Sequence, residues 1–265
     1  MKIARVEHEG KTYYGVVQDD RVKLFIGDPS GAMAEVGLTP PLTECKLLAP
    51  VMPPNIIAIG LNYRRHAAES QMEIPKQPLM FLKANTSVIG PHDPIVLPHM
   101  APDQVDYEAE LCIVIGRTAR NVSEADALDY VFGYTCGNDV SARDCQFGDK
   151  QWARGKSFDT FCPLGPWIET DIPDPENLGI RAVLNGQVMQ DSSTSDLIFG
   201  CRQLVSFLSH HLTLLPGTVI MTGTPEGVGF PRNPPVYLKP GDVIEIEIDG
   251  IGKISNPVVA DTASR

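Results

Sequence analysis

The sequence VDYEAELCIVIG, from Val105 to Gly116, places acidic residues directly before a strongly apolar run. Side chains on a β-strand alternate between its two faces, so Glu108 and Glu110 point to the same side. Two carboxylates held together beside a buried strand are costly unless a cation lies between them. Oxygen ligands suit Mg²⁺, Mn²⁺ or Ca²⁺. The stretch therefore predicts either a metal site or an edge strand whose acids face water.

The composition indicates a large globular protein. A chain of 265 residues with 43% hydrophobic residues can bury a sizeable core. The net charge of −11 and the lack of a basic run argue against nucleic acid or an anionic membrane as partners. No apolar run approaches the roughly 20 residues that span a bilayer, and no signal-peptide pattern is present. We therefore expect a cytoplasmic protein. Its six cysteines are scattered without a C-x-x-C pair and several lie in apolar strands, so they are expected to be reduced core residues.

Turn residues indicate a β-rich fold with some helix. The 23 glycines and 23 prolines lie mostly between short apolar alternations. Residues 1–50 are predicted to form a small β-rich N-terminal domain, and residues 51–265 a second, larger domain. Asn185-Gly186 predicts a type I′ hairpin, and the apolar spacing from Leu197 to Leu208 predicts an amphipathic helix.

A possible base with its orienting carboxylate lies near residue 66. The segment 61–69 is expected to contain a short helix, on which His66 and Glu69 share a face because they are three residues apart. Glu69 can then orient or charge the imidazole. The alternative is an ordinary solvated pair. Residues 70–78 are polar and contain two prolines, which suits a loop beside a site.

Other polar residues stand at the ends of predicted strands. The strand 134–140 ends near Asp139, and Arg143 and Gln146 follow at helical spacing. Lys156 precedes a further predicted strand. The glycine-dense turn 223–229 contains Thr224, whose hydroxyl could hold a carboxylate together with the backbone N–H groups. The alternative there is a plain tight turn.

Read together, these motifs resemble the fumarylacetoacetate hydrolase family. The resemblance covers roughly residues 50 to 260, and six segments match in order. They are GLNY to the histidine (60–66), DYEAEL (106–111), GNDVSAR (137–143), GKSFD (155–159), GTPEGVG (223–229) and LKPGD (238–242).

The resemblance implies a mixed, β-rich α+β fold, a β-sandwich roll that is usually homodimeric. It also implies one divalent ion per subunit, Mg²⁺ or Mn²⁺, held by Glu108, Glu110 and Asp139. Some relatives add a fourth acid from the strand before the histidine. Residues 57–60 offer none, so the three-ligand version is expected here.

The same resemblance implies a small 2-oxo acid substrate and a role for each site residue. Lys156 would supply positive charge near the metal and the developing enolate, while Arg143, Gln146 and Thr224 would contact the substrate. His66 and Glu69 would form the catalytic dyad, on a lid that is loose without ligand. Because the dyad is present, the first expectation is a metal-dependent hydrolase. It would cleave a C–C bond of a 2,4-dioxo acid of the acylpyruvate type through a metal-bound pyruvate enolate.

Two alternatives remain beside the hydrolase. One is an isomerase or decarboxylase of 2-oxo-ene-dioates or oxaloacetate, of the kind found in aromatic catabolism. The other is a non-catalytic metal-binding scaffold.

Overall fold

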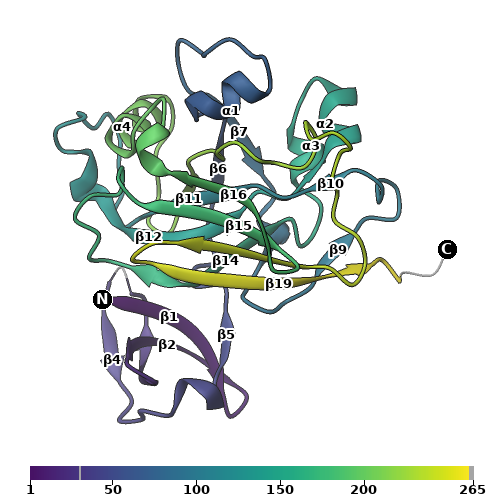
Figure 1. The fold of residues 1–265 in the computed structure, drawn as a ribbon. Coiled ribbons are helices and arrows are strands. Elements are labelled where there is room, and N and C mark those ends of the chain that lie inside the picture. The colour runs from purple at the N-terminus through teal and green to yellow at the C-terminus, as the bar shows by residue number, and fades with distance from the viewer. Residues whose placement is uncertain (30, 263–265) are drawn as a thin grey trace.

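A curled sheet of twelve strands forms the frame of the molecule in the computed structural model, which describes residues 1–29 and 31–262 (Figure 1). Its main path runs β4 (Met33–Glu35), β3 (Arg21–Gly27), β2 (Lys11–Gln18), β1 (Lys2–His8), β14 (Cys162–Glu169), β12 (Val131–Asn138), β11 (Ala109–Ile115), β17 (Val219–Met221), β6 (Ile56–Gly60) and β7 (Leu79–Lys83). Two short strands join beside this path, β5 (Lys46–Leu48) on β1 and β8 (Val88–Ile89) on β14.

A second sheet covers part of the first. Its order is β16 (Gln187–Ser193), β15 (Gly179–Leu184), β18 (Val243–Ile248), β19 (Gly252–Ala260) and β9 (Ile95–Leu97). Strands β11 and β12 pack against β15 and β18, and the apolar side chains between them form the main core. A two-stranded ribbon, β10 (Val105–Asp106) with β13 (Ser141–Ala142), lies beside them. The predicted β-rich α+β fold is confirmed.

The helices are short and lie around the strands. They are α1 (Arg64–Glu69), α2 (Arg143–Asp149), α3 (Ala153–Lys156) and α4 (Cys201–His211), with single 3₁₀ turns at Leu42–Glu44, Asn85–Ser87, Ala127–Tyr130 and Thr194–Asp196. Figure 1 shows α1, α2 and α3 at one end of the molecule, beyond β6 and β7. No helix in the described part of the chain is long and apolar enough to cross a membrane.

The N-terminal strands have a small core of their own. Ala4, Val6, Val17, Val22 and Leu24 are buried together there. Strand β1 pairs with β14 only at Lys2 and Ile3, so backbone hydrogen bonds join this unit to the rest over a short stretch. Figure 1 shows β1, β2 and β4 extending away from the larger body. The domain boundary after residue 50 stays a prediction.

Local expectations were met at the hairpin and corrected at the long helix. Asn185 and Gly186 have φ values of 51° and 80° between β15 and β16, as a type I′ turn requires. The predicted apolar helical stripe began at Leu197, but α4 begins at Cys201. Leu197 instead ends a 3₁₀ turn and forms an isolated bridge to Tyr63, so tertiary pairing takes it out of the helix.

Candidate active site

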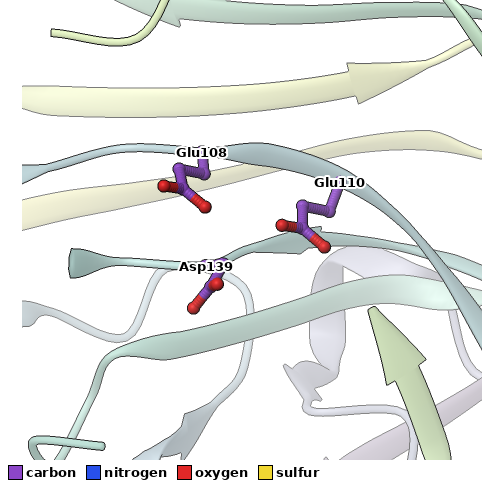
Figure 2. Close-up of side chains that lie close together, drawn as sticks. All are labelled: Glu108, Glu110 and Asp139. Carbon is purple, nitrogen blue, oxygen red and sulfur yellow. The ribbon is translucent and has the colours of Figure 1, made fainter. Parts of the chain in front are cut away.

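Three carboxylates meet where β11 begins and β12 ends. The antiparallel register places Ala109 opposite Asn138, so Glu108 and Glu110 come close to Asp139. All three residues are buried, and one oxygen from each lies within 4.8 Å of the others. Figure 2 shows the three side chains close together, with Asp139 on a different segment of the chain from Glu108 and Glu110. The predicted same-facing pair and its third acid are therefore brought together by the fold.

The pKa values of Glu108 and Glu110 shift in opposite directions. Burial raises the pKa of Glu110 well above its usual range, and the neighbouring Asp139 and Glu108 charges raise it further. Burial also opposes ionisation of Glu108, but Lys156 and Arg143 outweigh it and lower the pKa of Glu108 to about 2. Without a metal ion, burial and these two neighbouring charges favour the protonated form of Glu110. A buried group of oxygen ligands with one carboxylate lacking a cation suits a hard divalent ion.

Two lysines neutralise the other carboxylates. Lys156 Nζ, from the end of α3, lies 2.8 Å from Glu108 Oε2 and 2.7 Å from Asp139 Oδ2. Lys83 Nζ, from the end of β7, bonds to Asp139 Oδ1, and its side chain is buried. The sequence interpretation missed Lys83. The sequence pattern that could have indicated Lys83 is the one that indicated Asp139, namely a charged residue at the end of an apolar strand.

The buried charges around the site sum to one negative when all are ionised. Four carboxylates stand against three cations, namely Asp106, Glu108, Glu110 and Asp139 against Lys83, Arg143 and Lys156. A proton on Glu110 makes the sum zero. A divalent ion in place of that proton would make it one positive, which favours an anionic ligand.

Arg143, predicted to contact substrate, is held by several acceptors in the interior. Its Nε donates to Asp106 Oδ2 at 2.9 Å, and its Nη1 donates to Gln146 Oε1 at 2.8 Å. The same Nη1 lies 2.7 Å from Glu108 Oε1. Asp106, which the sequence interpretation did not single out, also accepts hydrogen bonds from the backbone N–H groups of Gly229 and Phe230. Arg143 is therefore fixed against the glycine-dense turn.

His66 and Glu69 form the expected pair on α1. His66 Nδ1 lies 3.3 Å from Glu69 Oε2, and both oxygens of Glu69 lie 3.1 Å from the N–H of Gly227. The pair thus joins α1 to the turn 223–229. Since Nδ1 faces Glu69, Nε2 is the ring nitrogen available for proton transfer.

Thr224 is positioned by a second residue that the sequence interpretation missed, Gln190. The buried amide of Gln190 donates from Nε2 to Thr224 Oγ1 at 2.9 Å and to the carbonyl of Pro225 at 2.8 Å. Its Oε1 accepts from the N–H of Ala109 at 2.9 Å, between Glu108 and Glu110. Because Thr224 Oγ1 accepts this bond, its own proton is free to donate elsewhere. Gln190 lies on β16 and was read only as part of a hairpin.

A cavity of about 190 Å³ unites these groups. Eight of the nine predicted site residues line it, and Glu69 lies behind His66. The rest of its lining includes Ser70 and apolar side chains, among them Met72, Phe81, Phe147, Trp152 and Phe230. A larger hollow of about 650 Å³, beside residues 235–240, contains none of the nine. The small cavity is therefore the candidate active site, and the role of each residue in it stays a prediction.

Comparisons with known proteins match the chain to two family models. Residues 55–259 match the family model described as fumarylacetoacetate (FAA) hydrolase C-terminal, and residues 1–50 match one described as Rv2993c-like, N-terminal. The chain is 51% identical over 222 residues to oxaloacetate tautomerase fahd2, mitochondrial, of Xenopus laevis, covering 82% of this chain and 69% of that protein.

A second relative and a solved structure are also similar to this chain. Oxaloacetate tautomerase FAHD2A, mitochondrial, of Homo sapiens is 44% identical over 224 residues, covering 83% of this chain and 71% of that protein. The X-ray structure of 5-carboxymethyl-2-hydroxymuconate delta-isomerase from Mycobacterium smegmatis is 44% identical with a TM-score of 0.89, covering 98% of this chain and all of that one.

Proposed function

This chain belongs to the fumarylacetoacetate hydrolase family, and on that premise we propose that it is a metal-dependent tautomerase or isomerase of a small 2-oxo acid such as oxaloacetate. The observation that carries the proposal is its 51% identity, over 82% of the chain, to a protein named oxaloacetate tautomerase. The cavity adds support, because it is lined both by a histidine that contacts a carboxylate and by three carboxylates that could hold a metal ion.

The isomerase alternative thus replaces C–C hydrolysis as the preferred reaction. Hydrolysis was expected because His66 and Glu69 are both present. That pair does not distinguish the reactions, since a general base can accept a proton from a carbon acid or an enol as well as from water. The names of the relatives favour proton transfer on the substrate itself.

Glu108, Glu110 and Asp139 would hold the metal ion, either Mg²⁺ or Mn²⁺. When bound, the ion acts as a Lewis acid toward the carboxylate and 2-oxo oxygens of the substrate. Lys156 keeps its own positive charge beside it: burial lowers the pKa of Lys156, but Asp139 and Glu108 outweigh that effect and raise it. Its ammonium group therefore stabilises negative charge developing on the substrate's 2-oxo oxygen.

His66 carries the proton in the proposed reaction. Converting the enol of oxaloacetate to the keto form removes the proton from the oxygen on carbon 2 and adds one to carbon 3. In this direction His66 Nε2 accepts the proton from the oxygen on carbon 2 and delivers one to carbon 3, while Glu69 holds Nδ1 and stabilises the charged imidazole between the two transfers. The Thr224 hydroxyl oxygen accepts a hydrogen bond from Gln190 Nε2, so its proton remains to donate to a substrate oxygen.

The test separates the candidate reactions by their products. Protein stripped with EDTA and reloaded with Mg²⁺ or Mn²⁺ is mixed with enol-oxaloacetate, and loss of the enol's ultraviolet absorbance is followed. We expect acceleration above the spontaneous rate only with metal, and its loss in His66→Asn. In parallel, an acylpyruvate is assayed for pyruvate with lactate dehydrogenase. Pyruvate release from it, with no effect on the enol, would establish the hydrolase instead, and no activity on either would favour the scaffold.

We also propose that the chain forms a homodimer through β7. This strand is the last on its side of the large sheet, and its outer backbone edge is unpaired within the described residues. Leu79 and Leu82 on it are 46% and 50% exposed. An edge strand with exposed apolar side chains is a template for pairing with another chain, and a second copy is the occupant we expect.

A further inference from the structure

Ser70 places an unpartnered hydroxyl in the candidate active site. It follows Glu69 directly and ends α1, and its backbone N–H donates to the carbonyl of His66 at 3.0 Å. Its side chain lines the same cavity as His66, Lys156 and Thr224. Its Oγ is buried, yet it makes no hydrogen bond to any atom in residues 1–29 or 31–262.

A buried hydroxyl without a partner needs an explanation. Leaving such a group unsatisfied costs about 1–3 kcal/mol, and the large majority of buried polar atoms in proteins are paired. A serine hydroxyl can donate one hydrogen bond and accept others. Because Ser70 lines a cavity and its hydroxyl has no partner in the described chain, a molecule that enters the cavity is the partner we expect.

The rest of the cavity indicates which part of that molecule Ser70 would meet. The charged groups gather on the strand ends and on α2 and α3, where the carboxylate and 2-oxo oxygens of the substrate are proposed to bind. Helix α1 is a separate element that lies beyond β6 and β7 (Figure 1). It contributes His66 and Ser70 to the lining of the cavity. Met72, two residues after Ser70, also lines the cavity, whereas Phe230 lies against the guanidinium of Arg143.

Building on the proposed function, we propose that Ser70 is a specificity-determining residue that donates a hydrogen bond to an oxygen at the distal end of the substrate. The substrate class is thereby narrowed to 2-oxo acids that carry a second carboxylate or carbonyl group. A 2-oxo acid that ends in a plain alkyl chain leaves the hydroxyl unsatisfied. Such acids bind less tightly for that reason.

Calorimetry with a matched pair of stable ligands tests this. Mn²⁺-loaded protein is titrated with 2-oxoglutarate and with 2-oxopentanoate, which has the same chain length but ends in a methyl group. For Ser70→Ala we expect the Kd for 2-oxoglutarate to rise about tenfold, the equivalent of about 1.4 kcal/mol. The Kd for 2-oxopentanoate should stay within about twofold, since it makes no bond to the hydroxyl.

Thr218→Val is the control variant. Thr218 also has a buried hydroxyl without a hydrogen-bond partner in the described chain, but it lies before β17 and does not line the cavity. It should leave both Kd values unchanged, and neither variant should lower the thermal unfolding midpoint. If Ser70→Ala changes the Kd of both 2-oxo acids by the same factor, or changes neither Kd, the hydroxyl does not select the substrate and the inference fails. If the wild-type protein binds neither 2-oxo acid, the proposed function fails as well.

Discussion

Asp106→Asn tests the buried ion pair beneath the candidate active site. Asp106 is fully buried, and its Oδ1 accepts from the N–H groups of Tyr107 at 2.9 Å and Gly229 at 2.8 Å. Its Oδ2 accepts from Arg143 Nε at 2.9 Å and Phe230 N at 3.0 Å, and lies 2.8 Å from Arg143 Nη2. Asparagine has the same shape but only one oxygen. If its oxygen keeps the two bonds of Oδ1, its NH₂ group faces Arg143 Nε, Arg143 Nη2 and Phe230 N, all of which are donors.

The expected loss follows from this geometry. Breaking a buried ion pair by removing one partner costs about 3–5 kcal/mol. Arg143 keeps Glu108 as a partner, but it loses both contacts to Asp106 Oδ2 and meets an NH₂ donor in their place. An exposed pair of similar length contributes only about 0–1 kcal/mol. Lys23 and Glu35, 2.7 Å apart with side chains 37% and 49% exposed, form such a pair. Asp106→Asn should therefore lower the free energy of unfolding by about 3–5 kcal/mol, and Glu35→Gln by less than about 1 kcal/mol.

Urea unfolding followed by tryptophan fluorescence measures both variants. The buffer contains EDTA, because a ligand that binds only the folded state would add its own stabilisation. If Asp106→Asn costs no more than Glu35→Gln, the charge of Arg143 does not depend on Asp106, and the reasoning about the pair is wrong.

Three further outcomes are expected. The raised pKa of Glu110 makes metal-free protein lose stability as the pH rises above the ordinary carboxyl pKa toward the raised one. Glu110→Gln should abolish this loss of stability in thermal unfolding with EDTA above the ordinary carboxyl pKa, and it should also abolish Mn²⁺ binding. If the unfolding midpoint of the wild-type protein does not change with pH there, the raised pKa is contradicted. Gln190→Glu replaces the amide donor by an acceptor, so the Thr224 hydroxyl donates to residue 190 and not to the substrate. The KM for the 2-oxo acid should rise about tenfold, with no further rise when Thr224→Val is added. Additive effects of the two substitutions on KM would refute the coupling. Leu82→Glu should yield monomers in light scattering, and an unaffected dimer would place the interface elsewhere.

Short-range features of this protein were predictable from its residues. The period of a strand puts Glu108 and Glu110 on one face, and the spacing of a helical turn brings His66 to Glu69. Asn185-Gly186 marks its hairpin because the turn needs positive φ at both residues. The six ordered motifs further indicated the family, and with it the three-carboxylate group.

Tertiary structure alone decided the partners of these residues. Lys83 reaches Asp139 from 56 positions away, and Gln190 reaches Ala109 from 81 positions away. Whether Arg143 points at Asp106 or into open space, and whether the Ser70 hydroxyl is paired, likewise has no periodic signal in the chain. Local patterns report only which face of one element a side chain occupies. Which distant side chain it meets depends on how β6, β7, β11 and β17 pair across the sheet, and so on the packing of the whole molecule.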